Sequence, residues 1–116
     1  MPNLKQSKQS PRYENGKFYW YKFDTFAIEL TINLKRLEDG SDIITNPNDE
    51  IEITFFKQNI PIHKFKYTNF QNGSKFLLNF DAPISKKFTP GIYEYTITYS
   101  GSNRTTIISK NSVEVE

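Results

Sequence analysis

The segment Thr-Phe-Ala-Ile-Glu-Leu-Thr-Ile-Asn-Leu, residues 25–34, carries the strictest hydrophobic pattern in the chain. Its large apolar residues occupy every second position: Phe26, Ile28, Leu30, Ile32 and Leu34. Side chains of a β-strand point alternately to opposite faces, whereas a helix would scatter these residues around its axis. The segment therefore predicts a strand with one buried face.

Similar alternation recurs on the C-terminal side of this segment, with turn signals between the apolar runs. We expect further strands over residues 50–57, 62–67, 75–80 and 92–99, and a last strand in two pieces, 104–108 and 112–116, broken near Lys110. On the N-terminal side, the aromatic residues 18–23 are either a short strand or an anchor that joins the N-terminal segment to the rest of the chain. A short helical turn is expected over residues 84–88. Val, Ile, Thr, Tyr, Phe and Trp, which suit pleated sheets, make up 43 of the 116 residues. Seven or eight short strands predict an all-β sandwich of two sheets.

Composition excludes several classes of function. The chain has no Cys, which excludes disulfide scaffolds, thiolate metal sites and cysteine nucleophiles. His63 is the single histidine, so a histidine metal site or a Ser-His-Asp triad is hard to build. No phosphate loop or dinucleotide fingerprint is present. We expect neither catalysis nor a bound metal or cofactor. No apolar run approaches the roughly 18 residues of a membrane span, and no apolar segment follows Met1, so neither a membrane protein nor a secretion signal is expected.

Charge divides the chain into two parts. Residues 1–22 carry five Lys or Arg against one Glu, and the rest carries ten basic and twelve acidic residues. Residues 1–16 hold too few apolar side chains to offset the entropy lost on ordering. We predict a flexible basic arm over residues 1–16 and a folded body over residues 17–116. The arm is either a solvated tail or a docking segment for an acidic protein surface. Nucleic acid is not the expected partner, because the body is slightly acidic.

Aromatic residues cluster where the arm meets the body. Neighbouring residues on a strand face opposite ways, so some of these rings must face outward, and an exposed aromatic patch is typical of a binding surface. The candidate partner-binding residues are Lys5, Lys8, Arg12, Tyr13, Lys17, Phe18, Tyr19, Trp20 and Tyr21. The alternative is that some of these rings belong to the core.

Acidic residues gather in the connection before residue 50 and just after it: Asp39, Asp42, Asp49, Glu50 and Glu52. Their spacing does not match a twelve-residue calcium loop. Turn chemistry and solvent-facing strand positions explain them.

The segment Phe-Thr-Pro-Gly-Ile-Tyr-Glu-Tyr-Thr-Ile, residues 88–97, predicts a structural corner made by Gly91, Tyr93 and Tyr95. Gly91 permits the turn, and Tyr93 can return its hydroxyl to an upstream backbone group. Together with Arg-Thr-Thr-Ile-Ile at 104–108 and Val-Glu-Val-Glu at 113–116, it resembles the immunoglobulin-like N-terminal domain of siphophage upper baseplate proteins. Their first long strand usually starts near Gly-Asp-Thr, and here Phe23 stands in place of that Gly.

The resemblance implies an immunoglobulin-like antiparallel β-sandwich of seven to eight strands with a flexible N-terminal arm. It implies a non-enzymatic structural component of a phage virion that docks on other virion proteins as a capsid decoration, head–tail or baseplate module. Such a protein is made in the bacterial cytoplasm, is a monomer or weak oligomer alone, and is present in many copies in the assembly. The alternative is a module that binds carbohydrate or a cell surface through its aromatic residues.

Overall fold

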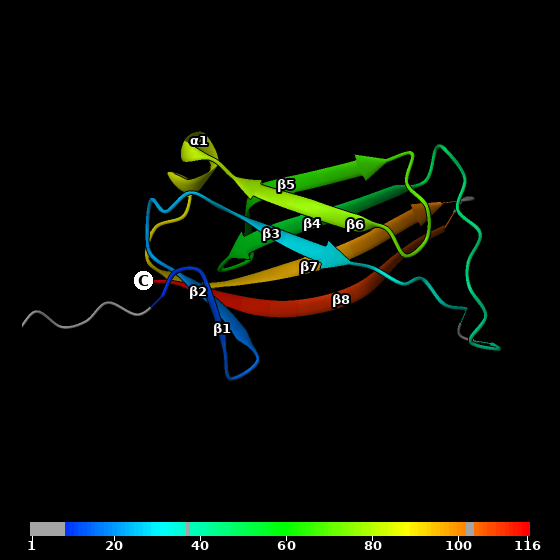
Figure 1. Cartoon of the computed structure of the whole chain (residues 1–116), viewed down its shortest axis with the longest axis horizontal. Helices are drawn as coiled ribbons and strands as arrows, with labels where there is room; N and C mark the ends of the chain where they lie inside the picture. The colour runs from blue at the N-terminus through cyan, green and yellow to red at the C-terminus, as the bar shows by residue number, and fades with distance from the viewer. Residues whose placement is uncertain (1–8, 37, 102–103) are drawn as a thin grey trace, which may run out of the picture.

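The computed structural model of this chain arranges eight strands and one helical turn in two layers (Figure 1). It describes residues 9–36, 38–101 and 104–116, apart from the side chains of residues 104–108. The elements are β1 (Arg12–Glu14), β2 (Lys17–Trp20), β3 (Phe26–Thr31), β4 (Glu50–Lys57), β5 (Ile60–Thr68), β6 (Lys75–Phe80), α1 (Ala82–Ser85), β7 (Gly91–Gly101) and β8 (Arg104–Val115). The all-β prediction is confirmed, and most strand positions agree with those expected.

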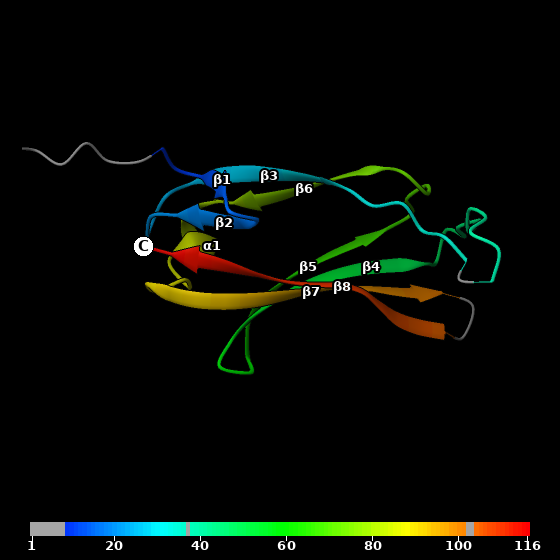
Figure 2. The same ribbon diagram turned by 90° about the horizontal axis from the view of Figure 1, so that it is seen from below.

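The larger sheet has six strands in the order β1-β2-β8-β7-β4-β5, and the smaller sheet pairs β3 with β6. All neighbours are antiparallel except β2, which runs parallel to β8. Figure 2 shows β3 and β6 as one layer and β4, β5, β7 and β8 as the other, with β1 and β2 beside the β3 end of the small sheet. The large sheet thus curls around the edge of the small one.

The core lies between the two layers and follows the predicted alternation. In β3 and the residues after it, Ile28, Ile32 and Leu34 are buried and Phe26 and Leu30 pack against the same cluster. The other buried apolar side chains come from β2, β4, β6, β7, β8 and the segment after α1: Trp20, Ile51, Ile53, Phe55, Phe76, Leu78, Phe80, Phe88, Tyr93, Ile97, Tyr99, Val113 and Val115. Aromatic rings supply much of the volume that a chain with few Leu and Val would otherwise lack.

The helical turn and the last strand differ from their predicted bounds. The helix covers residues 82–85 rather than 84–88, because the Asp81 side chain accepts the Ile84 N–H and Pro83 fits the first turn. The last strand is continuous through Lys110, because β8 pairs with β7 along its whole length. The register between β7 and β8 shifts between Ile97 and Thr98 of β7. The break that we expected in β8 is absent from its described backbone.

The N-terminal boundary also differs from the prediction. Residues 12–16, which we assigned to a mobile arm, form β1 and its turn to β2. Asn15 and Gly16 both have positive φ, 53° and 77°, as a two-residue hairpin turn requires. A strand with few apolar residues can still form when backbone hydrogen bonds to a neighbouring strand stabilise it. Composition alone therefore placed the start of the folded body at residue 17, which is too late in the chain. Residues 1–8 of the predicted arm lie outside the described residues.

Candidate interaction surface

Strand alternation divides the predicted partner-binding residues between two faces of the β1–β2 hairpin. Phe18 and Trp20 of β2 face the core beside Val113 and Val115 of β8, their partners in the register. Tyr19 lies between them in sequence and faces the other way. The predicted residues are therefore not one continuous patch.

The outward face of the hairpin is an ion-pair network within the molecule. Arg12 Nε lies 3.1 Å from a carboxylate oxygen of Glu14, and Arg12 Nη1 lies 2.5 Å from one of Glu116. The Arg12 guanidinium also stacks 4.6 Å from the centre of the Tyr19 ring. Lys17 is 3.7 Å from the Glu114 carboxylate. Arg12 and Lys17 are thus engaged inside the fold rather than presented to a partner.

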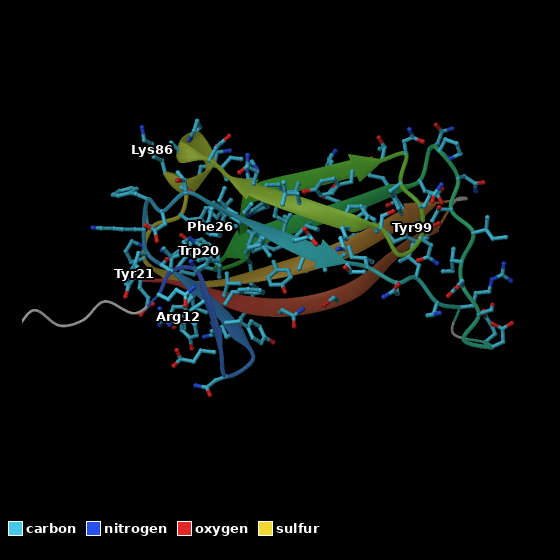
Figure 3. All side chains as sticks on the ribbon, in the orientation of Figure 1. Arg12, Trp20, Tyr21, Phe26, Lys86 and Tyr99 are labelled. Atoms are coloured by element: carbon cyan, nitrogen blue, oxygen red, sulfur yellow. The ribbon has the colours of Figure 1, made fainter. Side chains whose placement is uncertain are left out.

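Trp20 is part of the core, so its assignment to a partner-binding surface is wrong. Its side chain is 1% exposed and packs against the rings of Phe26, Phe80 and Phe88, with centroids 5.2–5.8 Å apart. In Figure 3, Trp20 and Phe26 lie close together near the start of β3. The reason is register: Trp20 pairs with Val115, whose side chain is buried.

Tyr13 is the predicted residue that remains on the surface. It is 65% exposed, and its ring makes an edge contact with Phe18 at 4.8 Å. Because β1 is the outer strand of the large sheet, Tyr13 lies at a sheet edge. Tyr21, at the end of the hairpin, is half-buried, and its backbone N–H donates to Ser10 Oγ at 3.1 Å. Lys5 and Lys8 lie outside the described residues.

The predicted corner is present. Tyr93 is buried and its hydroxyl donates to the Thr89 carbonyl at 2.8 Å. Gly91 has a φ of 147°, and the Lys57 side chain approaches to 3.1 Å of the position that a Cβ would take there. Tyr95 packs its ring 5.3 Å from Phe55, and burial raises the pKa of its phenol. The corner fixes the start of β7 against the core.

Phe23, the last ring of the aromatic cluster beside the N-terminal segment, is exposed in the turn between β2 and β3. It is 62% exposed and has a φ of 67°. The turn is closed by the Asp24 N–H, which donates to the Tyr21 carbonyl at 3.1 Å. Its place at the end of the aromatic run of residues 18–23 already put it next to the candidate surface in the sequence.

One acidic residue also departs from its predicted place. Asp49, expected in a solvated turn, is 2% exposed and accepts the Tyr99 hydroxyl at 2.6 Å and the Asn46 N–H at 3.0 Å. Burial, followed by the hydrogen bond to Asp49, raises the pKa of Tyr99 to about 12. This pair closes the end of the fold opposite α1 (Figure 3).

The hollow in the described core offers little room for a ligand. This hollow between the two layers, lined by Phe18, Leu30, Tyr95 and their neighbours, has a volume of about 10 Å³, which fits one water at most. The described residues contain no group of three or more His, Cys, Asp or Glu side chains arranged to hold a metal ion. Burial, then the nearby Lys87 ammonium, lowers the pKa of His63. Within the described part of the chain, no helix has the length and apolar character needed to cross a membrane.

Comparisons with protein-family models, with curated proteins and with solved structures find no match to this chain.

Proposed function

We propose that the two layers form an immunoglobulin-like sandwich. Support comes from the strand order: β3 pairs with β6 as strands B and E do, and β8-β7-β4-β5 follows the order G-F-C-C′. The Tyr93 hydroxyl bond to Thr89 at the start of β7 matches a tyrosine corner at the start of strand F. Two features depart from antibody domains: there is no disulfide, and the core tryptophan lies on β2 rather than on strand C.

We further propose that the chain is a non-enzymatic structural component of a phage virion that docks on another virion protein. The observation that carries this proposal is Tyr13, an exposed ring on the outer edge strand of the large sheet, directly after the basic N-terminal segment that holds Lys5 and Lys8. Aromatic side chains anchor protein interfaces because they bury a large area with few rotatable bonds. Lysines of the segment guide the encounter with an acidic surface, and the Tyr13 edge then makes the specific contact.

The proposed docking uses only groups that the fold leaves available. Arg12 and Lys17 are held by carboxylates of Glu14, Glu114 and Glu116, so they position the hairpin instead of binding the partner. Each contact is small, and many copies on one particle supply avidity. The placement as capsid decoration, head–tail or baseplate module follows from the resemblance.

The test is incorporation into particles of the phage that encodes the chain. A phage lacking the gene is complemented with the parent chain or with Tyr13→Ser, and the copies per particle are counted by quantitative mass spectrometry. We expect Tyr13→Ser to lower occupancy at least tenfold while the purified protein melts as the parent does. Leu77→Ser is the matched control, because Leu77 is 56% exposed on the other sheet.

Two results would contradict the proposal. One is full occupancy with Tyr13→Ser, and the other is absence of the parent chain from particles. A glycan array probed with the same proteins distinguishes the alternative, since Tyr13-dependent glycan binding would favour a carbohydrate-binding module.

A further inference from the structure

The turn between β2 and β3 holds an aromatic ring in a conformation that glycine prefers. Phe23 is the third residue of the turn that the Asp24 N–H closes on the Tyr21 carbonyl, and its φ of 67° is unfavourable for a side chain with a Cβ. The ring is 62% exposed, so little burial within the chain offsets this strain. Strain together with an exposed ring indicates a side chain kept for a contact outside its own fold.

One basic side chain lies beside this ring, and another is at the same end of the molecule. Lys22 Nζ lies 5.7 Å from the centre of the Phe23 ring. The Ser85 hydroxyl donates to the Asp24 carbonyl at 2.5 Å, which ties α1 to the turn, and the exposed Lys86 follows α1 at the same end (Figure 3). We refer to Lys22 and Phe23 as the Phe23 knob.

A hollow lined in part by the acidic side chain of Glu94 lies on the outer face of the large sheet. Its volume is about 230 Å³. It is lined by Phe56, Gln58, Asn59, Ile92 and Glu94. Ile92 is 59% exposed, and its partner across the strands is the acidic Glu114. A cavity of about 150 Å³ is large enough for benzene, so a phenylalanine ring fits this volume. We refer to it as the Phe56–Ile92 hollow.

We propose that the Phe23 knob of one copy docks in the Phe56–Ile92 hollow of a second copy, with Lys22 beside Glu94. The charges are complementary: Lys22 accompanies the ring, and the Glu94 carboxylate lines the hollow. Phe23 and Ile92 are both largely exposed within one molecule, so the knob does not fill the hollow of its own copy. Glu94 is 3.3 Å from Lys110 in an exposed ion pair, which an arriving lysine can join or replace.

The contact is weak by its size. One aromatic side chain buries roughly 150–250 Å², far less than the 1,200 Å² or more of a stable interface. We expect a dissociation constant on the order of 0.1–1 mM, which leaves a monomer at micromolar concentration and supports contacts between copies held close together. This inference does not depend on the virion proposal, since it concerns only the chain with itself.

Sedimentation equilibrium of the purified full chain from about 10 μM to 2 mM, at low and high salt, tests the contact. We expect the average mass of the parent to rise with concentration, and less so at high salt. Phe23→Gly should weaken association at least tenfold and raise the melting temperature, because glycine relieves the turn. Ile92→Ser should weaken association without raising the melting temperature.

Exchanging the charges at positions 22 and 94 provides the most specific test of the contact. Lys22→Glu and Glu94→Lys should each remain monomeric alone, since each places like charges together, and an equimolar mixture should associate as the parent does. Asn69→Gly, at another positive φ of 55°, and Leu77→Ser are the matched controls and should associate like the parent. A parent that stays monomeric to 2 mM, a Phe23→Gly protein that still associates, or a mixture that does not recover would overturn the proposal.

Discussion

Tyr99 and Asp49 show how single residues close the end of the fold opposite α1. Their hydrogen bond is buried, and Gly101 makes room for it, since a Cβ there would lie 2.6 Å from both Asp49 Oδ1 and Tyr99 Oη. Tyr99→Phe removes the donor and leaves the Asp49 carboxylate with the Asn46 N–H. We expect a loss of about 1–3 kcal/mol in the free energy of unfolding near pH 7, measured by urea denaturation.

The same pair predicts a response to alkaline pH. The pKa of Tyr99 is about 12 in the folded protein, against about 10 in an unfolded chain. The folded state therefore keeps a proton that the unfolded state releases, so this stabilisation is complete below pH 10 and is lost as pH rises through 12. Burial raises the pKa values of Tyr67 and Tyr95 in the same direction. Melting temperatures from pH 8 to 11.5 should fall less steeply for Tyr99→Phe than for the parent; equal slopes would contradict this assignment.

Two substitutions of Tyr93 distinguish the stability contributed by its hydrogen bond from the stability contributed by the packing of its ring. Tyr93→Ala should cost about 3–5 kcal/mol, because it empties a fully buried aromatic position. Tyr93→Phe keeps the ring and loses only the bond to Thr89, so we expect about 0.5–1.5 kcal/mol. Both values come from chemical denaturation. If the two variants cost the same, the ring does not support the core as described.

At the scale of elements, period-two patterning was enough to predict β3, β4, β6 and β7, because each has one buried face. Lys64 and Lys66 on β5 and Lys75 on β6 also lie on edge strands, as expected for charges that discourage edge pairing. The hydrophobic pattern did not predict β1 or the bounds of α1, because other interactions determine these elements. β1 depends on the Asn15-Gly16 turn, and the start of α1 depends on the Asp81 cap. The candidate surface was predicted only in part, since register buries Trp20 and a positive φ exposes Phe23.

The Asn72 side chain forms hydrogen bonds with the connection between β3 and β4, although the sequence alone indicates only a turn residue at this position. Asn72 Oδ1 accepts the Leu34 N–H at 2.7 Å, and its Nδ2 donates to the carbonyls of Leu34 and Ile43 at 2.8 and 2.9 Å. Asn72→Ala leaves three backbone groups without these partners, and we expect a loss of about 2–3 kcal/mol in urea denaturation. Asn79→Ala, exposed on β6, is the control and should change stability by less than about 0.5 kcal/mol.

At the scale of the whole molecule, the N-terminal segment has two parts that truncation should separate. Residues 1–8 hold too few apolar side chains to bury much surface, so we expect their deletion to leave the melting temperature unchanged. Deleting residues 1–16 also removes β1, the bond from Tyr21 to Ser10, and the Arg12 ion pair with Glu116. Glu116, directly after β8, then loses its cation, and β2 becomes the edge of the large sheet. We expect the longer deletion to lower the melting temperature by several degrees, since losses of about 1–2 kcal/mol have that effect in a domain of this size. Calorimetry of both truncations checks this. Equal melting temperatures would contradict this expectation and mean that β1 adds no measurable stability.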